Sequence, residues 1–226
     1  MESFQRAFIV MFAVLIVAWN NFVSAQRARI PQKWNNGIVP YKISDKFSTA
    51  DKRAILEALP IFDKMTCVRF KPYNQDKPET SYVQFSVGLQ CQSAIGRTGG
   101  AQIVMLGKNC MDKRSILREM MHVLGFNDEH LRSDRDDYIT VNLNNIKQAD
   151  WLFFEKLTDK ELPRFGLPYD FDSVLQRPNN WKVDPAAGPN AVSMFVKKAK
   201  SQPLGRVDSL THLDINKIKA FYECPA

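Results

Sequence analysis

Residues 118–136, near the middle of the chain, gather side chains that could carry acid–base or metal chemistry. The segment holds two glutamates, three aspartates and two of the three histidines. Glu119 and His122 lie three positions apart, where apolar residues recur at helical spacing, at positions 117, 120, 121 and 124. A helix here would carry a carboxylate that can take a proton and an imidazole that can bind a metal.

The pattern around these residues resembles the zinc-binding motif of one class of protease. Metzincin proteases carry H-E-x-x-H on a helix, so that both imidazoles share one face and the glutamate reaches the metal-bound water. A glycine then ends the helix and lets the chain return a third ligand. Here Arg118 stands at the first histidine position, followed by Glu119, His122 and Gly125. From Glu119 to Asp136 the frame is unbroken, and it resembles the extended astacin signature, H-E-x-x-H-x-x-G-F-x-H-E-H-x-R-x-D-R-D.

The resemblance to astacins extends from Trp34 to Cys224 and includes residues 66–70, 96–102 and 169–174. It implies an α+β fold with two lobes, a mixed sheet, an active-site helix and an irregular C-terminal lobe. It also implies zinc as cofactor, endopeptidase activity and an extended peptide bound along the upper edge strand. We therefore assign residues 26–226 to one astacin-like peptidase domain.

The chain departs from the family at most positions of the metal site. Arg118 replaces the first zinc-binding histidine, and Asp128 replaces the third. At the Met-turn, Leu175 replaces the methionine, and the following histidine and tyrosine are Gln176 and Arg177. Of the usual metal-site side chains, the second histidine and the catalytic glutamate remain.

These departures differ in severity. Leucine for methionine is nearly neutral in volume, and Asp128 could still bind zinc through its carboxylate. The guanidinium of Arg118 offers no lone pair and stays charged. At about 4 Å and an effective dielectric of about 20, Arg118 beside Zn²⁺ would be unfavourable by about 8 kcal/mol. We therefore expect the guanidinium to occupy the metal position and pair with Asp128 and Glu119, with Arg177 as a second cation near Glu119.

Two functions follow from this site. The first is a non-catalytic homologue that keeps a cleft for an extended peptide or protein, in which Glu119 is an idle base and ion-pair partner. In that case His122 and Asp128 are vestigial metal positions, and His122 is a buried, hydrogen-bonded histidine. The alternative is an active zinc endopeptidase with metal on His122, Asp128 and a further group. His130 matches a family histidine that does not bind zinc, and we expect His212 at the surface.

Apolar spacing and capping residues predict the helices and strands that position the site. We expect a helix over 50–64 and strands over 68–71, 82–87 and 103–106, with 96–100 as a loop. Pro40 limits the strand over 38–43 to the edge of the sheet. Ser115 caps the active-site helix, which Gly125 ends. Thr211 opens a last helix with a capping box.

Composition and charge narrow the classes of partner. Hydrophobic residues make up 45% and charged residues 24% of the chain, as in a soluble globular protein. The net charge of +7 fits a basic surface that favours solubility, or an acidic partner such as an anionic matrix. No basic run is long enough to indicate nucleic acid.

The first 25 residues resemble a signal peptide. Arg6 precedes an apolar run over 7–19, and a small-x-small pattern ends at Ala25. A membrane span needs about 20 apolar residues, so we predict cleavage after Ala25 and an extracellular, secreted protein without a membrane span. A short membrane anchor is the alternative.

Secretion makes the four cysteines candidates for two disulfides, with three possible connectivities. The resemblance to astacins implies the pairs Cys67–Cys224 and Cys91–Cys110.

Overall fold

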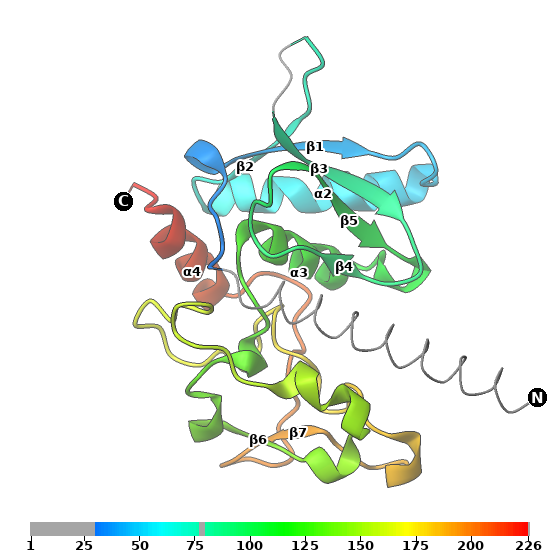
Figure 1. Ribbon diagram of the computed structural model, residues 1–226, viewed down its shortest axis with the longest axis vertical. Coiled ribbons are helices and arrows are strands. Elements are labelled where there is room, and N and C mark those ends of the chain that lie inside the picture. Colours follow the sequence, from blue (N-terminus) through cyan, green and yellow to red (C-terminus); the bar gives the residue numbers. More distant parts are fainter. Residues whose placement is uncertain (1–29, 77–79, 226) are drawn as a thin grey trace, which may run out of the picture.

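The computed structural model describes residues 30–76 and 80–225, so the predicted signal peptide lies outside the described residues. The fold is α+β, with two lobes stacked along the long axis of the molecule (Figure 1). Within the described residues, no helix is both long and apolar enough to cross a membrane.

The first lobe is built on a mixed five-stranded sheet with strand order β2-β1-β3-β5-β4. The first four strands in this order are parallel, and β4 at the edge is antiparallel to β5. The strands are β1 (Ile38–Ile43), β2 (Arg69–Pro72), β3 (Ser81–Val87), β4 (Gln92–Ser93) and β5 (Gly100–Leu106).

The expected edge position of β1 is wrong, because β1 pairs with both β2 and β3. Pro40 is nevertheless accommodated. Its partner on β2 is Lys71, whereas pairing with β3 begins only at Tyr41. The missing N–H of the proline therefore removes no hydrogen bond that β3 would make.

Three α-helices accompany the sheet. They are α2 (Thr49–Met65), α3 (Lys113–Leu124) and α4 (His212–Tyr222). The N-cap of α2 is Ser48, whose hydroxyl accepts from Asp51 N, and the helix continues through the exposed Pro60. Leu56, which the helical spacing of apolar residues would place in the core, is 46% exposed.

The second lobe has little regular structure. It contains the antiparallel pair β6 (Ile139–Val141) and β7 (Met194–Val196). The remaining elements are short 3₁₀ helices, in both lobes: η1 (Asn35–Gly37), η2 (Lys108–Cys110), η3 (Glu129–Leu131), η4 (Arg135–Asp137), η5 (Leu143–Asn145), η6 (Gln148–Phe154) and η7 (Pro185–Ala187).

Each lobe has its own apolar core. The larger cluster joins the sheet, α2 and α3, and it includes Leu175 and Ile218 from later in the chain. The smaller cluster lies in the second lobe around Ile139, Phe154 and Met194. Helix α3 lies between the sheet and the second lobe (Figure 1), so its two sides face different surroundings.

Two disulfides tie the chain together, Cys67–Cys224 and Cys91–Cys110, which are the pairs implied by the resemblance. The first joins the segment after α2 to the residues after α4, and the second joins the segments before β4 and at the end of η2.

We expect the two disulfides to differ in their contribution to stability. They close loops with sequence separations of 157 and 19 residues. In the chain-entropy model, the longer loop corresponds to about 5 kcal/mol and the shorter to about 3 kcal/mol. Urea unfolding of the two paired Cys→Ser variants measures both values. A larger loss from removing Cys91–Cys110 would contradict this order.

Candidate functional site

Helix α3 carries the site and is buried on all sides after its first turn. Its N-cap is Asp112, whose carboxylate accepts from Ser115 N at 2.9 Å, so the expected cap at Ser115 is wrong. Residues 116–124 are all buried. Gly125 ends the helix with φ of 112°, and a side chain there would meet Phe221 and Pro31. The apolar side of α3 packs in the first core. The charged side chains on its other side are buried as well, so they need ion-pair or hydrogen-bond partners.

The guanidinium of Arg118 lies against the carboxylate of Asp128. Arg118 Nη2 donates to Asp128 Oδ1 at 2.5 Å and to Oδ2 at 2.7 Å, and Nε donates to Oδ1 at 3.1 Å. Both side chains are less than one-tenth exposed. The structure therefore contains the ion pair expected from the paired replacement.

Glu119 also has partners for both carboxylate oxygens. Arg118 Nη1 donates to Oε1 at 3.0 Å, and the hydroxyl of Ser93 donates to Oε2 at 2.7 Å. Ser93 lies in β4, so this contact joins the edge of the sheet to α3. Each oxygen of Glu119 thus accepts a hydrogen bond within the protein.

Arg177 is the second cation of the cluster, but it bonds to Asp128 rather than to Glu119. Its Nε donates to Asp128 Oδ2 at 3.0 Å. The guanidinium carbon lies 4.3 Å from the centre of the Trp181 ring, a cation–π geometry. The side chain is 24% exposed, whereas those of Arg118 and Asp128 are almost fully buried.

His122 completes the group. Its Nδ1 lies 2.6 Å from the carbonyl oxygen of Phe126, and its Nε2 lies 3.7 Å from Asp128 Oδ1. The ring is therefore buried and hydrogen-bonded to the backbone beyond the end of α3.

The surroundings shift the protonation equilibria of the cluster. Burial alone would raise the pKa of Asp128, but Arg118 and Arg177 outweigh burial and hold it well below its usual value. Burial, followed by the charge of Arg118, lowers the pKa of His122. The same two causes lower the pKa of Arg177 to about 10. At neutral pH Asp128 is thus an ionised carboxylate, and it lies beside a neutral His122 imidazole and a charged Arg177 guanidinium.

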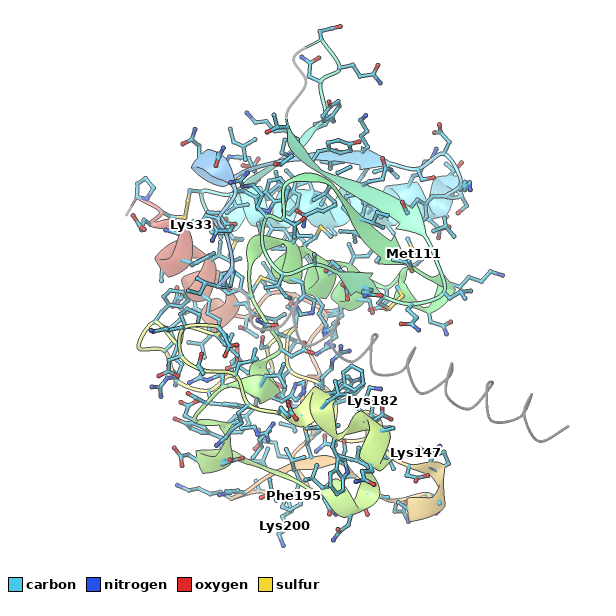
Figure 2. The ribbon with its side chains drawn as sticks, in the orientation of Figure 1. Lys33, Met111, Lys147, Lys182, Phe195 and Lys200 are labelled. Atoms are coloured by element: carbon cyan, nitrogen blue, oxygen red, sulfur yellow. A yellow bond between two sulfur atoms is a disulfide. The ribbon has the colours of Figure 1, made fainter. Side chains whose placement is uncertain are left out.

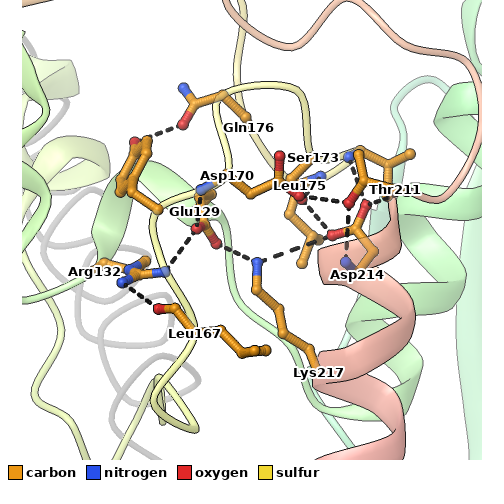
Figure 3. Close-up of polar contacts among 12 residues, drawn as sticks. Glu129, Arg132, Leu167, Asp170, Ser173, Leu175, Gln176, Thr211, Asp214 and Lys217 are labelled. Carbon is orange, nitrogen blue, oxygen red and sulfur yellow. Dashed lines mark hydrogen bonds and ion pairs between the residues drawn. The ribbon is translucent and has the colours of Figure 1, made fainter.

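The loop that carries Arg177 is anchored from two sides. Arg114 Nη2 donates to Gln176 O at 2.6 Å and to Ser173 O at 3.3 Å. From α4, the carboxylate of Asp214 accepts from Ser173 Oγ at 2.6 Å and from Val174 N at 3.1 Å (Figure 3). These bonds fix the backbone immediately before Arg177.

A second buried ionic network lies beside this loop (Figure 3). Glu129 Oε2 accepts from Lys217 Nζ at 2.6 Å, and Oε1 accepts from Arg132 Nη1 and Asp170 N, both at 3.0 Å. Lys217 comes from α4, so the network joins α4 to the segment that follows α3.

Leu175 and Gln176, at the expected Met-turn, are both buried. Leu175 belongs to the first core, and its carbonyl oxygen accepts from Glu129 N at 3.1 Å. The amide oxygen of Gln176 accepts from the hydroxyl of Tyr169 at 2.6 Å. Both residues therefore contribute to packing and to the conformation of the loop.

The remaining histidines lie where the sequence indicated. His130 is fully buried, with Nε2 3.1 Å from Phe153 O and the ring against Phe154 and Trp181. His212 is exposed in the first turn of α4.

The residues of this site do not fit a zinc ion. Arg118 fills the place of a ligand without offering a lone pair. The Asp128 oxygens already accept from two guanidinium groups. In the described part of the chain, no three His, Cys, Asp or Glu side chains are grouped so that they could hold a metal ion.

Three residues of the site were not anticipated from the sequence. Ser93 lies in a strand of two residues, and Trp181 lies in an irregular loop, so neither carries a periodic signal. Arg114 is one position into α3 and resembles any surface arginine until the loop at Gln176 folds against it.

The sequence of the chain is similar to that of known peptidases. Residues 26–223 match the family model described as Astacin, a family of peptidases. Zinc metalloproteinase nas-7 of Caenorhabditis elegans is 32% identical over 198 residues, which cover 88% of this chain and 50% of the relative. Bone morphogenetic protein 1 of Xenopus laevis is 31% identical over 204 residues, covering 89% and 28%. The chain spans about half the length of the curated relatives it matches.

A solved structure shows the same fold. High choriolytic enzyme 1, a hatching enzyme zinc-protease from Oryzias latipes, superposes with a TM-score of 0.78 and 28% identity. The superposition covers 87% of this chain and 95% of that one. The two-lobed α+β architecture of this chain is therefore shared with that hatching enzyme.

Loss of Asp128 is expected to destabilise the protein strongly. Asp128→Ala leaves two guanidinium groups beside each other without their shared carboxylate, which corresponds to about 3–5 kcal/mol for a broken buried pair. Chemical unfolding measures this loss. Asp45→Ala is the matched control, because Asp45 pairs with Lys52 at the surface and should matter little. An Asp128→Ala protein as stable as the unmodified one would rule out a structural ion pair.

His130 is expected to give the fold a measurable pH dependence. Burial lowers its pKa from 6.5 to about 3, so the folded state resists protonation that the unfolded chain accepts. Its contribution to stability is complete above the unfolded pKa and declines as the pH falls towards the folded pKa, by up to about 1.4 kcal/mol per pH unit. His130→Gln should flatten the stability profile by about this slope between about pH 6 and pH 4.

The exposed His212 provides the control, since His212→Gln should leave the profile unchanged. Parallel profiles for His130→Gln and the unmodified protein, measured by urea unfolding at each pH, would show that His130 does not carry the effect.

Proposed function

Since this chain belongs to the astacin family of metalloproteases, we propose that it is a secreted member without zinc-dependent peptidase activity that binds an extended peptide or protein. The observation that carries the proposal is the contact of the Arg118 guanidinium with both oxygens of Asp128. A cation occupies the place that the family gives to a zinc ligand, and a carboxylate neutralises it.

The hydrogen bonds of Glu119 support the proposed loss of peptidase activity. A general base must lie within hydrogen-bond reach of the proton that it takes, and a cation bonded to it makes it a weaker base. Both oxygens of Glu119 accept hydrogen bonds, from Arg118 and from Ser93. In this proposal Glu119 serves as the second counter-ion of Arg118.

The edge of the sheet supports peptide binding. Strand β4 is the last strand in the sheet order and pairs only with β5 among the described strands. Its other edge can offer backbone groups to an added strand, a common mode of peptide recognition. Ser93 in β4 contacts Glu119, so a peptide on this edge would run beside the ion cluster.

Zinc content and casein cleavage test the loss of activity directly. We expect the unmodified protein to contain no stoichiometric zinc and to leave casein intact. The Arg118→His, Asp128→His variant restores two imidazoles on an intact scaffold and should gain zinc, measured by plasma emission spectroscopy. Because Arg177 also differs from the family, cleavage by this variant should be weak.

The matched control adds Glu119→Gln to the double variant, which should keep the zinc and lose any cleavage. Stoichiometric zinc together with chelator-sensitive cleavage by the unmodified protein would contradict the proposal. That result would favour an active endopeptidase with metal on His122, Asp128 and a further group.

A further inference from the structure

A pocket of about 610 Å³ opens in the second lobe, away from the ion cluster. It is lined by β6, by η6 and by Lys197 at the end of β7. β6 and β7 lie at the end of the molecule opposite the sheet of the first lobe (Figure 1). Its volume falls in the range of about 300–1,000 Å³ that is typical of ligand sites.

The pocket has an apolar lining. Ile139 and Phe154, at its floor, are almost fully buried. Leu143 and Trp151 are 38% and 40% exposed, and both line the pocket. Among the described residues, these two are the large apolar side chains that the second lobe leaves exposed. Their gathering in one concave site distinguishes them from scattered surface residues.

Trp151 is held in place by the backbone around it. Its Nε1 lies 3.1 Å from Ile146 O and 3.3 Å from Leu143 O, and it donates towards both. The polar edge of the indole is therefore satisfied, and the exposed part of the ring offers apolar surface. A tryptophan fixed in this way can anchor a partner at low entropic cost.

Lysines without a carboxylate partner in the part of the chain that the structure describes lie at and next to one side of the pocket, at Lys197 and in the residues that follow it. Asp136 is already paired with Arg135 and Lys156, at 3.2 and 2.8 Å. Lys197 opens an exposed segment with Lys198 and Lys200, and across the described chain none of the three ammonium groups has a carboxylate partner.

Lys200 lies over the ring of Phe195, at 5.6 Å, and both lie at the lower end of the molecule (Figure 2). Glu155 is the rim carboxylate that lacks an ion pair within the described residues. The described lining thus holds one ammonium and one carboxylate without an ion pair, Lys197 and Glu155, and two further unpaired lysines follow Lys197 in the same exposed segment.

We propose that this pocket is a docking site for a protein segment that presents one large apolar side chain flanked by acidic residues. The apolar side chain would fill the space beside Trp151 and Leu143, and the acidic residues would meet Lys197 and its neighbours. The exposed apolar residues line a hollow rather than project from the surface, which favours an inserted side chain over contact with a lipid surface. The pocket shares none of its described lining residues with the ion cluster, so the test of peptide binding does not depend on the proposed loss of activity.

Capped pentapeptides provide the probe. The first has phenylalanine between pairs of aspartates, the second replaces the phenylalanine with alanine, and the third replaces the aspartates with lysines. Titration into the ¹⁵N-labelled protein follows the indole signal of Trp151, assigned with a Trp151→Phe variant. We expect the first peptide to bind at least about tenfold more tightly than either of the others.

Two variants test the pocket itself. Leu143→Asp places a charge in the apolar lining at a partly exposed position and should weaken binding by about tenfold. Lys197→Glu should weaken it by about threefold and reduce its salt dependence. Lys46→Glu is the matched control, because Lys46 is an exposed lysine of the other lobe, and binding should be unchanged.

Other outcomes would overturn the proposal. Equal binding of all three peptides, or loss of binding in Lys46→Glu, would show that the pocket lacks this specificity. Binding to vesicles of anionic lipid that Leu143→Asp abolishes, without peptide binding, would identify a membrane surface instead. Self-association in sedimentation that Leu143→Asp abolishes, without peptide binding, would identify a second copy as the occupant.

Discussion

The buried contact between Arg118 and Asp128 is the interaction on which the rest of the site depends. Two ions removed from water need close geometry and further hydrogen bonds to offset their lost hydration. Arg118 meets that need with three bonds to Asp128 and one to Glu119, and Asp128 meets it with a second guanidinium from Arg177. The pair thereby ties α3 to the segment after Gly125 and to the loop before Trp181. Each of these segments is held again from α4 or from Arg114, so the cluster is closed on several sides.

The same contact explains why the departures from the family pattern at positions 118, 128 and 177 are compatible with one another. A histidine lost at position 118 alone would leave an incomplete metal site, and an arginine there alone would leave a buried cation. With aspartate at 128, the cation has a counter-ion, and Arg177 balances the remaining charge of Glu119 and Asp128. On the proposed function, the scaffold keeps its cohesion through charged side chains where its relatives use a metal. Glu119 then belongs to the structure of the site rather than to a reaction.

Much of this arrangement could be predicted from the sequence, because local signals marked it. The capping box at Thr211, the αL glycine at 125 and the apolar spacing of α3 each fix a local geometry that tertiary packing does not override. The paired replacement at 118 and 128 predicted the ion pair, because two positions that face one site must balance their charges.

The place of β1 inside the sheet could not be predicted, because the signal of Pro40 depends on where β3 begins. Arg177 is a second cation of the cluster, as predicted, but its hydrogen bond to Asp128 and its contact with Trp181, which lies in an irregular loop, could not be predicted. The pocket beside Trp151 is formed by short segments distant in sequence and leaves no motif.

On the proposed function, an ion cluster rather than a metal occupies the site on α3. A ligand that binds the folded state raises its stability by about 2.7 kcal/mol when present at about a hundred times its dissociation constant. The most direct measurement is therefore the melting temperature of the unmodified protein in excess zinc and in excess chelator. The ion cluster predicts the same melting temperature in both. A melting temperature several degrees higher in zinc, reversed by chelator, would show that the folded protein holds the metal and would contradict this account.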